Sequence, residues 1–502
     1  MRVALVNPPL VTQKSDFFSS GIPYFPIGMA YLASTLREKG FDVNVIDRFG
    51  LAPRRVTDFK DKFIVQGISE DDALLRIPSD TQLVCLYAAL VTSHSLNLSL
   101  LRTLRQKLPK AKLVVFENSQ QVYAYSLREV FQELLDAGAD YVVFGEPEER
   151  VTAIAQALEQ KRPLPAESTP EFNGVAYKND AGMQFLLEKT SFIKDLDSLP
   201  FPAFELFPLQ NYWDLGYSHG PYSGKYLPLL TSRGCPYGCK FCVVPSTNQR
   251  RWRVRSAKSI VDEMEHFGRT LGVTDFHWED LNPNLNRDRL VDMCNDILAR
   301  KLRVTWKFSA GSKGEIYDEE EIELMAKAGC VYISISPESG SPRVLKLMDK
   351  PFDHEKALRL IRKMSEAGIS TQACFVLGFP GETAEDRCAT HEYLRRLTEA
   401  GLDETSLFIM TPIPGSSQYP NPDLQGYDDF AELTFTPEWR TDFKKLSSFR
   451  TGLYAKFIVW KARYHPEKLV GNAVNFLSGN KFKVKTEMTL WRVFKTNFVY
   501  RK

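Results

Sequence analysis

The chain has 502 residues and a formal net charge of +2, with acidic and basic residues interspersed along its length. This length is enough for two or three domains, and the near-neutral charge argues against a surface dedicated to nucleic acid. No stretch approaches the roughly 18 apolar residues of a membrane span, and the N-terminus lacks the pattern of a signal peptide. The sequence therefore predicts a cytoplasmic protein.

The first predicted unit, residues 1–165, alternates short apolar strands with amphipathic helices. The strands are expected at 3–6, 41–46, 82–86, 112–116 and 141–144, and the helices between them include 28–39, 96–107 and 126–137. This order is typical of an α/β fold with a doubly wound, Rossmann-like or flavodoxin-like parallel sheet. Such sheets bind their ligands at the carboxyl ends of the strands, so we expect a cleft there.

Residues 166–225 are expected to form a linker that carries a small hairpin. A proline-rich stretch, 161–170, precedes two short strand patterns at 174–177 and 183–187 with a turn between them.

The third predicted unit, residues 226–420, again alternates strands with helices. Six strands are expected, at 226–231, 273–278, 303–309, 331–336, 371–377 and 405–411. Six such repeats predict a (β/α)6 partial TIM barrel, in which functional residues collect at the carboxyl ends of the strands.

Three cysteines, Cys235, Cys239 and Cys242, directly follow the first of these strands in a C-x3-C-x2-C arrangement. Glycines and a proline between them favour a loop, and a loop can point several thiolates at one place. Because a protein-ligated four-iron cluster takes four ligands, three thiolates leave one iron open. The spacing therefore predicts an open iron–sulfur site, against the alternative of three core cysteines that happen to cluster.

The other five cysteines fall singly on predicted strands or helices, as reduced thiols of a cytoplasmic protein do. They are Cys85, Cys294, Cys330, Cys374 and Cys388.

Polar residues and glycines recur where the other barrel strands end. Each could be a mere turn or helix cap, and Ser339 and Thr383 would serve well as caps. Together, and at the same end as the cysteine triplet, they favour a shared site. The candidates are Glu279, Ser309, Glu338, Ser339, Gly378, Gly381 and Glu382.

The cysteine motif after a first barrel strand resembles the signature of the radical S-adenosylmethionine (SAM) superfamily. The resemblance implies a [4Fe–4S] cluster on the three cysteines, SAM on the fourth iron, and one-electron cleavage of SAM to a 5′-deoxyadenosyl radical. Glu338-Ser339 matches the element near the SAM ribose, and 378–382 matches the loop near the adenine and methionine. The residues expected at SAM are Phe241, Glu279, Ser309, Glu338, Ser339, Gly378, Gly381 and Glu382.

The N-terminal unit resembles the cobalamin (B12)-binding domain of one large branch of that superfamily. The matching pieces are the Asn7-Pro-Pro turn, Pro26–Leu32 and Asp140–Glu146. Two departures are present: no D-x-H-x-x-G motif offers an axial histidine, and 117–121 replaces a glycine-rich loop. The alternative is a flavodoxin-like domain that has lost cobalamin or uses its cleft for substrate. The residues expected in the cobalamin cleft are Asn7, Pro8, Tyr87, Glu117, Gly145 and Glu146.

The last segment, residues 421–502, is expected to be mainly helical. Aromatic residues at 491, 494 and 498 have helical spacing, which predicts a cap packed on the barrel. Peripheral membrane contact is the second interpretation, because basic residues surround these aromatics.

The resemblance implies a cytoplasmic biosynthetic enzyme that acts on an unactivated carbon of a small-molecule, lipid or tetrapyrrole-like metabolite. Cobalamin-dependent methyl transfer is the expected reaction, with flavodoxin or ferredoxin as electron donor. Radical cyclisation or oxidative rearrangement without methyl transfer is the alternative. A non-catalytic iron–sulfur redox sensor would not need the polar strand ends, and an RNA-modifying role is disfavoured by the near-neutral charge.

Overall fold

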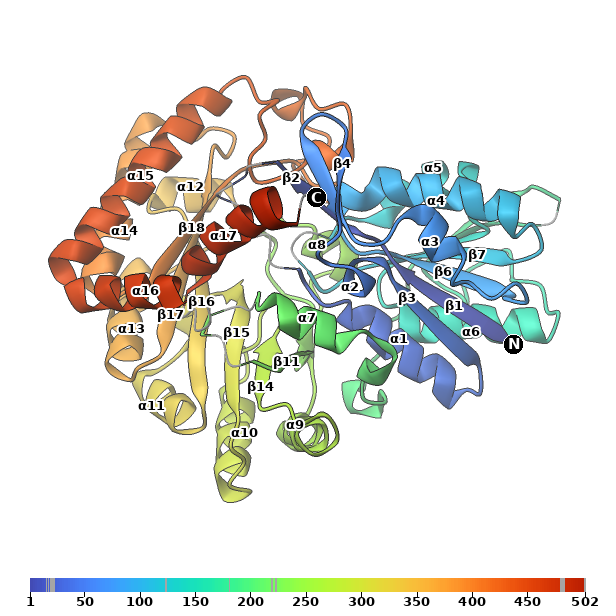
Figure 1. Cartoon of the computed structure of the whole chain (residues 1–502), viewed down its shortest axis with the longest axis horizontal. Helices are drawn as coiled ribbons and strands as arrows, with labels where there is room; N and C mark the ends of the chain where they lie inside the picture. The colour runs from blue at the N-terminus through green and yellow to red at the C-terminus, as the bar shows by residue number, and fades with distance from the viewer. Residues whose placement is uncertain are drawn as a thin grey trace.

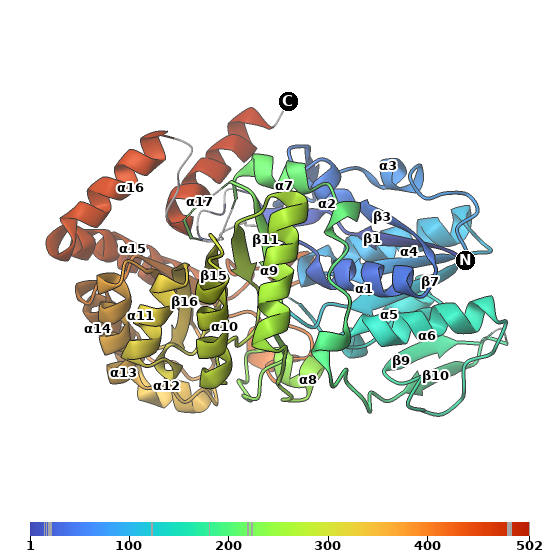
Figure 2. The same cartoon turned by 90° about the horizontal axis from the view of Figure 1, so that it is seen from below.

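The computed structural model describes residues 1–14, 16, 18, 23–121, 124–179, 181–217, 220, 221, 224–478 and 484–500. Two α/β units lie side by side, and the C-terminal helices lie across the second unit (Figures 1 and 2). Within the described residues, no helix is both long and apolar enough to cross a membrane.

The first unit is a seven-stranded sheet in the order β10-β9-β8-β7-β6-β1-β3. Five of its strands, β1, β3, β6, β7 and β8, are parallel to one another, and the predicted hairpin, β9 and β10, adds antiparallel to the edge at β8. The hairpin therefore extends the N-terminal sheet instead of standing in a separate linker. The strands are β1 (Arg2–Asn7), β3 (Asp42–Asp47), β6 (Leu83–Ala88), β7 (Lys112–Glu117), β8 (Tyr141–Val143), β9 (Val175–Lys178) and β10 (Gln184–Leu187).

Helices cover both faces of this sheet, which is why the middle residues of its central strands are apolar and buried (Figure 1). The helices α1 and α6 pack together on one face, and α3, α4 and α5 lie on the other. A small antiparallel sheet, β2-β5-β4, continues from the end of β1. These elements are α1 (Ile27–Glu38), α2 (Arg48–Leu51), α3 (Glu70–Leu74), α4 (His94–Lys107), α5 (Phe131–Asp136), α6 (Pro147–Glu159), β2 (Leu10–Gln13), β4 (Val56–Phe59) and β5 (Phe63–Gln66).

The second unit is a six-stranded parallel sheet in the order β11-β14-β15-β16-β17-β18, with helices outside it. The predicted doubly wound sheet, (β/α)6 partial barrel and helical C-terminal segment are thus confirmed. The strands are β11 (Tyr226–Leu229), β14 (Asp275–Trp278), β15 (Thr305–Ser312), β16 (Cys330–Glu338), β17 (Ser370–Leu377) and β18 (Glu404–Ile409). The helices are α9 (Ala257–Leu271), α10 (Arg287–Ala299), α11 (Glu319–Lys327), α12 (Pro342–Leu347), α13 (His354–Glu366) and α14 (Ala384–Glu399).

Short elements connect the two units around the cysteine loop. Two residues of each of β12 and β13 pair antiparallel and flank that loop on either side. These elements are α7 (Leu209–Leu215), α8 (Val244–Asn248), β12 (Ser232–Arg233) and β13 (Arg253–Val254).

Buried ion pairs hold the two units together. The guanidinium of Arg233 lies 2.6 Å from Glu148, and that of Arg253 lies 2.7 Å from Glu146. Both carboxylates are at the start of α6, where the helix dipole favours negative charge. The strands that flank the cysteine loop are therefore fixed to the N-terminal sheet.

The C-terminal segment begins with α15 (Phe443–Tyr464), which packs on α14, and continues through α16 (Pro466–Ser478) and α17 (Lys485–Phe494) into a π-helical turn, Lys495–Val499. The Tyr454 hydroxyl accepts a hydrogen bond from the Leu407 amide, which fixes α15 to β18.

The prediction that the aromatics at 491, 494 and 498 face a core is wrong for two of them. Phe494 is 48% exposed and Phe498 is 75% exposed, whereas Trp491 packs partly against the core. The three rings stack along one helical face, so their spacing brings them onto each other instead of onto the barrel. Within the predicted C-terminal segment, residues 479–483, 501 and 502 lie outside the described residues.

Candidate active site

The cysteine loop leaves β11 in an irregular course that glycine makes possible. Gly234 has φ +82°, and a Cβ added there would lie 1.9 Å from the Arg251 carbonyl oxygen. Just before it, the Thr231 amide and hydroxyl donate to the buried Asp280 carboxylate at 2.8 and 2.6 Å. The start of the loop is thus pinned to the end of β14, and the following residues are free to point their thiols inward.

The three predicted thiols, Cys235, Cys239 and Cys242, line one cavity of about 1420 Å³, open mouth included, at the carboxyl end of the barrel. Burial raises the pKa of Cys239 to about 11 and of Cys242 to about 12, so both are protonated at neutral pH unless a metal displaces the proton. Within the described residues, no three His, Cys, Asp or Glu side chains converge on one metal-ion position. Three thiols that line one cavity could each bind a different iron of a cluster.

Glu338 ends β16 and projects into the same cavity. Its φ is +62°, an uncommon conformation for a residue with a side chain, and strand pairing is irregular just before it. Such strain costs on the order of 1–3 kcal/mol and tends to occur at functional sites. The Lys350 ammonium, 2.5 Å from the Glu338 carboxylate, also lines the cavity, and the anionic neighbours raise the Lys350 pKa, so it is charged.

Two buried hydroxyls in the cavity wall lack a hydrogen-bond partner among the described residues. They are Ser309 Oγ, 2% exposed, and Thr411 Oγ1, 3% exposed. A buried polar group without a partner costs on the order of 1–3 kcal/mol. Both hydroxyls therefore indicate that a polar ligand belongs in this cavity.

Of the residues expected at SAM, Phe241, Ser309 and Glu338 line the cavity, whereas the five others do not. The Ser339 hydroxyl is 3.2 Å from the Thr390 hydroxyl and accepts a hydrogen bond from the Ser341 amide. It therefore stabilises the turn after β16.

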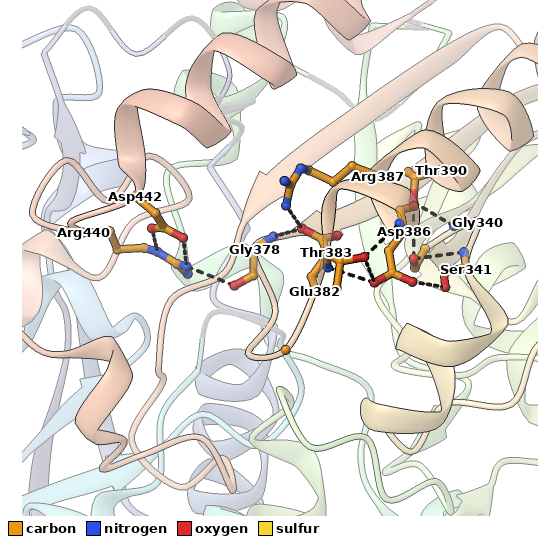
Figure 3. A network of polar contacts seen from close by, with 12 residues as sticks. Gly340, Ser341, Gly378, Glu382, Thr383, Asp386, Arg387, Thr390, Arg440 and Asp442 are labelled. Atoms are coloured by element: carbon orange, nitrogen blue, oxygen red, sulfur yellow. Dashed lines mark hydrogen bonds and ion pairs between the residues drawn. The ribbon is translucent and has the colours of Figure 1, made fainter.

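The loop 378–382 bonds largely to itself and to neighbouring helices (Figure 3). The Gly378 amide donates to Glu382 Oε2 at 2.8 Å, and Arg387 lies 3.4 Å from the same oxygen. The Gly378 carbonyl accepts from Arg440 at 3.0 Å, and the Gly381 carbonyl accepts from Arg343 at 2.7 Å. Gly378 and Gly381 have positive φ angles, which shape this loop. The polar groups of the loop form hydrogen bonds to other protein groups.

Glu279 lies between the two units, away from the cysteine cavity. Gln121 Nε2 donates to its carboxylate at 3.4 Å, and burial raises the pKa of Glu279 to about 8. The side chain is therefore largely neutral at pH 7.

A second, smaller cleft of about 380 Å³ lies at the carboxyl end of the N-terminal sheet. Asn7, Pro8 and Tyr87 line it, as expected for that edge of a parallel sheet. The lining residues are Asn7, Pro8, Pro9, Leu10, Pro23, Tyr24, Pro26, Phe49, Tyr87, Ala89, Leu90 and Gln121.

The other three residues expected in this cleft have structural contacts instead. The Glu117 carboxylate accepts from the amides of Leu127 and Gly145, and Glu146 forms the ion pair with Arg253. Buried carboxylates of this kind close loops and join the units, so they are not available to a ligand in the cleft.

Tyr24 lines both cavities, so the strand-end cleft adjoins the cysteine cavity. Neither Tyr24 nor Lys350 was among the site residues predicted from the sequence. A local signal for Tyr24 exists, because it lies two residues before the Pro26–Leu32 motif. Lys350 has none, because only the fold brings it to Glu338.

An open six-stranded barrel with three thiols at its carboxyl end defines a cluster-binding α/β enzyme. Comparison with known proteins gives the family: residues 229–394 match the model of the radical SAM superfamily. Residues 229–394 thus form a radical SAM domain, and the sequence-based prediction of that superfamily is confirmed for this part of the chain.

Relatives resemble the chain over most of its length. It is 26% identical over 468 residues to a cytidylyl-2-hydroxyethylphosphonate methyltransferase of Streptomyces wedmorensis, with 86% of this chain and 84% of the relative covered. It is 25% identical over 477 residues to an anaerobic magnesium-protoporphyrin IX monomethyl ester cyclase of Cereibacter sphaeroides, with 93% and 71% covered.

The fold is also that of a solved structure, TsrM from Kitasatospora setae, a radical SAM methyltransferase crystallised with cobalamin and a [4Fe–4S] cluster. The TM-score is 0.61 at 20% identity, and the match covers 83% of this chain and 73% of TsrM.

The cofactors of the superfamily, a [4Fe–4S] cluster and SAM, fit what the cavity offers. The three thiols supply all but one of the ligands of a four-iron cluster. The two unpartnered hydroxyls and the Glu338–Lys350 pair are polar groups of the kind that could bind the amino, carboxylate and ribose groups of SAM. The lining of the cavity reaches from the cysteine loop to β18.

Proposed function

We propose that the protein is a cobalamin-dependent radical SAM methyltransferase that modifies an unactivated carbon of a small-molecule metabolite. The observation that carries the proposal is the sharing of Tyr24 by the cysteine cavity and the strand-end cleft. Ligands bound in these two places would face each other across one opening. The names of the methyltransferase relatives and the cobalamin in TsrM support the same reading.

The strand-end cleft suits one face of a corrin. A corrin is a flat, largely apolar ring with amide side chains, and the cleft offers prolines and aromatic rings together with the amides of Asn7 and Gln121. We propose that cobalamin binds in this cleft, whose lining contains no histidine among the described residues. Asn7, Pro8, Tyr87 and Gln121 would hold it there.

The chain's own residues bind and orient the cofactors. We assign Cys235, Cys239 and Cys242 to the cluster, and Phe241, Ser309, Glu338 and Lys350 to SAM. When bound, the cluster and SAM supply the radical that abstracts hydrogen, and cobalamin supplies the methyl group. The protein excludes water and aligns the target carbon, and a one-electron donor such as flavodoxin or ferredoxin provides the reductant.

The test is cofactor content and turnover of anaerobically reconstituted protein. We expect about four irons and one cobalt per chain, and 5′-deoxyadenosine from SAM with dithionite. Cys235→Ala should lose cluster iron and at least about a hundredfold of the 5′-deoxyadenosine rate, whereas Cys388→Ala, at an exposed cysteine on α14, should retain both. Undiminished SAM cleavage in Cys235→Ala would refute the assignment of that cysteine.

A second candidate is radical cyclisation or oxidative rearrangement without methyl transfer. It is favoured by the 117–121 loop, in which Glu117 ties the backbone to neighbouring loops instead of leaving a glycine-rich surface for a cofactor. Resemblance to a cyclase points the same way. SAM cleavage by a protein that takes up iron but no cobalt would decide for this candidate.

A further inference from the structure

We propose that the lower part of the cysteine cavity is a substrate subsite for an uncharged, oxygen-bearing group such as an alcohol, ketone or amide. We call it the barrel well, and it is lined by Ser334, Gln372, Cys374 and Ser406. The inference rests on the proposed function, because it gives the substrate class for that same site.

The barrel well lies deep in the barrel, on neighbouring strands. Ser334 on β16 is the register partner of Gln372 on β17, and Cys374 is the partner of Ser406 on β18. Gln372 precedes Gly378, at the strand end, by six residues, which is about 20 Å of strand. A ligand group in the barrel well is therefore far below the mouth of the barrel.

Hydroxyl groups of the barrel well keep hydrogen-bonding capacity for a ligand. Ser334 donates to the Gln372 amide oxygen at 2.9 Å, and the Gln372 amide nitrogen donates to Ser406 Oγ at 2.8 Å. Ser406 accepts in this contact, so its own hydrogen can be given to a ligand acceptor.

Charged side chains of the cavity wall lie outside the barrel well and already have partners. They are Glu338, which pairs with Lys350, and Lys313, which is 3.0 Å from Glu315. Lys307 on β15, which does not line the cavity, is 2.6 Å from Asp275. A carboxylate or phosphate in the well would lose its hydration without gaining a counter-ion, which is costly.

Nearer the strand ends, the same side of β17 and β18 is apolar. Phe408 and Phe435 lie with ring centroids 4.3 Å apart, and both line the cavity with Val376. The barrel well therefore suits a substrate whose hydrocarbon body packs on these rings while its neutral oxygen atoms meet the serines.

Cys374 makes the charge preference measurable, because it is a thiol in the wall of the well. Anaerobic holoenzyme is treated with iodoacetamide, which is neutral, or iodoacetate, which is anionic and of similar size, and peptides are mapped by mass. Exposed Cys388 serves as the internal reference. We expect the preference for iodoacetamide to be at least about tenfold greater at Cys374 than at Cys388.

Equal preferences at the two cysteines, or no labelling of Cys374 by iodoacetamide after Cys388 has reacted fully, would overturn the inference. Cys374→Ser identifies the labelled peptide. The same sample is assayed for 5′-deoxyadenosine, so that the two proposals fail separately. If the protein cleaves SAM but Cys374 shows no preference for iodoacetamide, only the barrel well is rejected. If Cys374 shows the expected preference but the protein has no SAM cleavage or no cobalt, the proposed function is rejected.

Discussion

At the scale of single residues, Glu279 is the most unusual group of the structure. It is a buried carboxyl at the junction of the two units, with one amide donor from Gln121 and no cation beside it among the described residues. Its neutral form is favoured because burial penalises charge more than the single hydrogen bond compensates. The folded protein therefore holds a proton that the unfolded chain releases at lower pH.

This proton makes stability depend on pH. The pKa of Glu279 is raised from 4.5 to about 8 on folding, so its stabilising effect is complete below pH 4.5 and is lost as the pH rises to 8. Compared with Glu279→Gln, which keeps an acceptor for Gln121, wild type should lose about 1 kcal/mol of unfolding free energy per pH unit across that window.

Urea denaturation of cluster-free protein at several pH values measures the difference. A gap between the two proteins that is constant from pH 5 to pH 8 would show that Glu279 is already ionised in the folded state.

At the scale of elements, the cysteine loop depends on one glycine more than on any side chain that packs around it. Gly234→Ala would place a methyl group against the Arg251 carbonyl at a φ that only glycine adopts easily. We expect a loss of about 2 kcal/mol in stability and of most cluster iron, since the thiols would be displaced.

The matched control is Gly452→Ala on α15, where an added Cβ meets nothing within 4 Å. It should raise the unfolding free energy by about 1 kcal/mol through helix propensity. Iron analysis and thermal unfolding of both variants test the pair, and full iron content in Gly234→Ala would contradict the account of the loop.

Elements were also the level at which the sequence was most informative. Strands and helices were predictable because apolar periodicity is local, and the three thiols because cluster ligands are close together in the chain. The structural contacts of Glu117, Glu146 and Ser339 were not predictable, since their hydrogen-bond and ion-pair partners come from distant segments. Lys350 was not predicted as a site residue for the same reason. The exposure of Phe494 and Phe498 was not predicted because helical spacing alone does not say which side of a helix is buried.

At the scale of the whole molecule, the two units depend on buried charge pairs between them. Arg233→Met would leave the Glu148 carboxylate buried without its partner, so we expect a loss of about 3 kcal/mol in unfolding free energy. Adding Glu148→Gln to that variant should recover a large part of the loss, because the unpaired charge is gone.

Arg128→Met serves as the comparison, because its pair with Glu188 is exposed and should contribute less than about 1 kcal/mol. Denaturant unfolding of cluster-free protein gives the three values. Equal effects of Arg233→Met and Arg128→Met would mean that the buried pairs do not couple the units.

The barrel stops at six strands, so β18 is an edge, and what lies along it is not another strand. The Ile409 amide donates to the Phe435 carbonyl at 3.3 Å, and the Phe435 ring completes the wall of the cavity. An edge covered by an irregular segment is protected from pairing with other chains. This irregular segment also makes one wall of the cavity adjustable. Insertions or deletions between 411 and 442 can widen or narrow the space for substrate while every barrel strand keeps its register. Related enzymes can therefore diverge in substrate size through this segment alone.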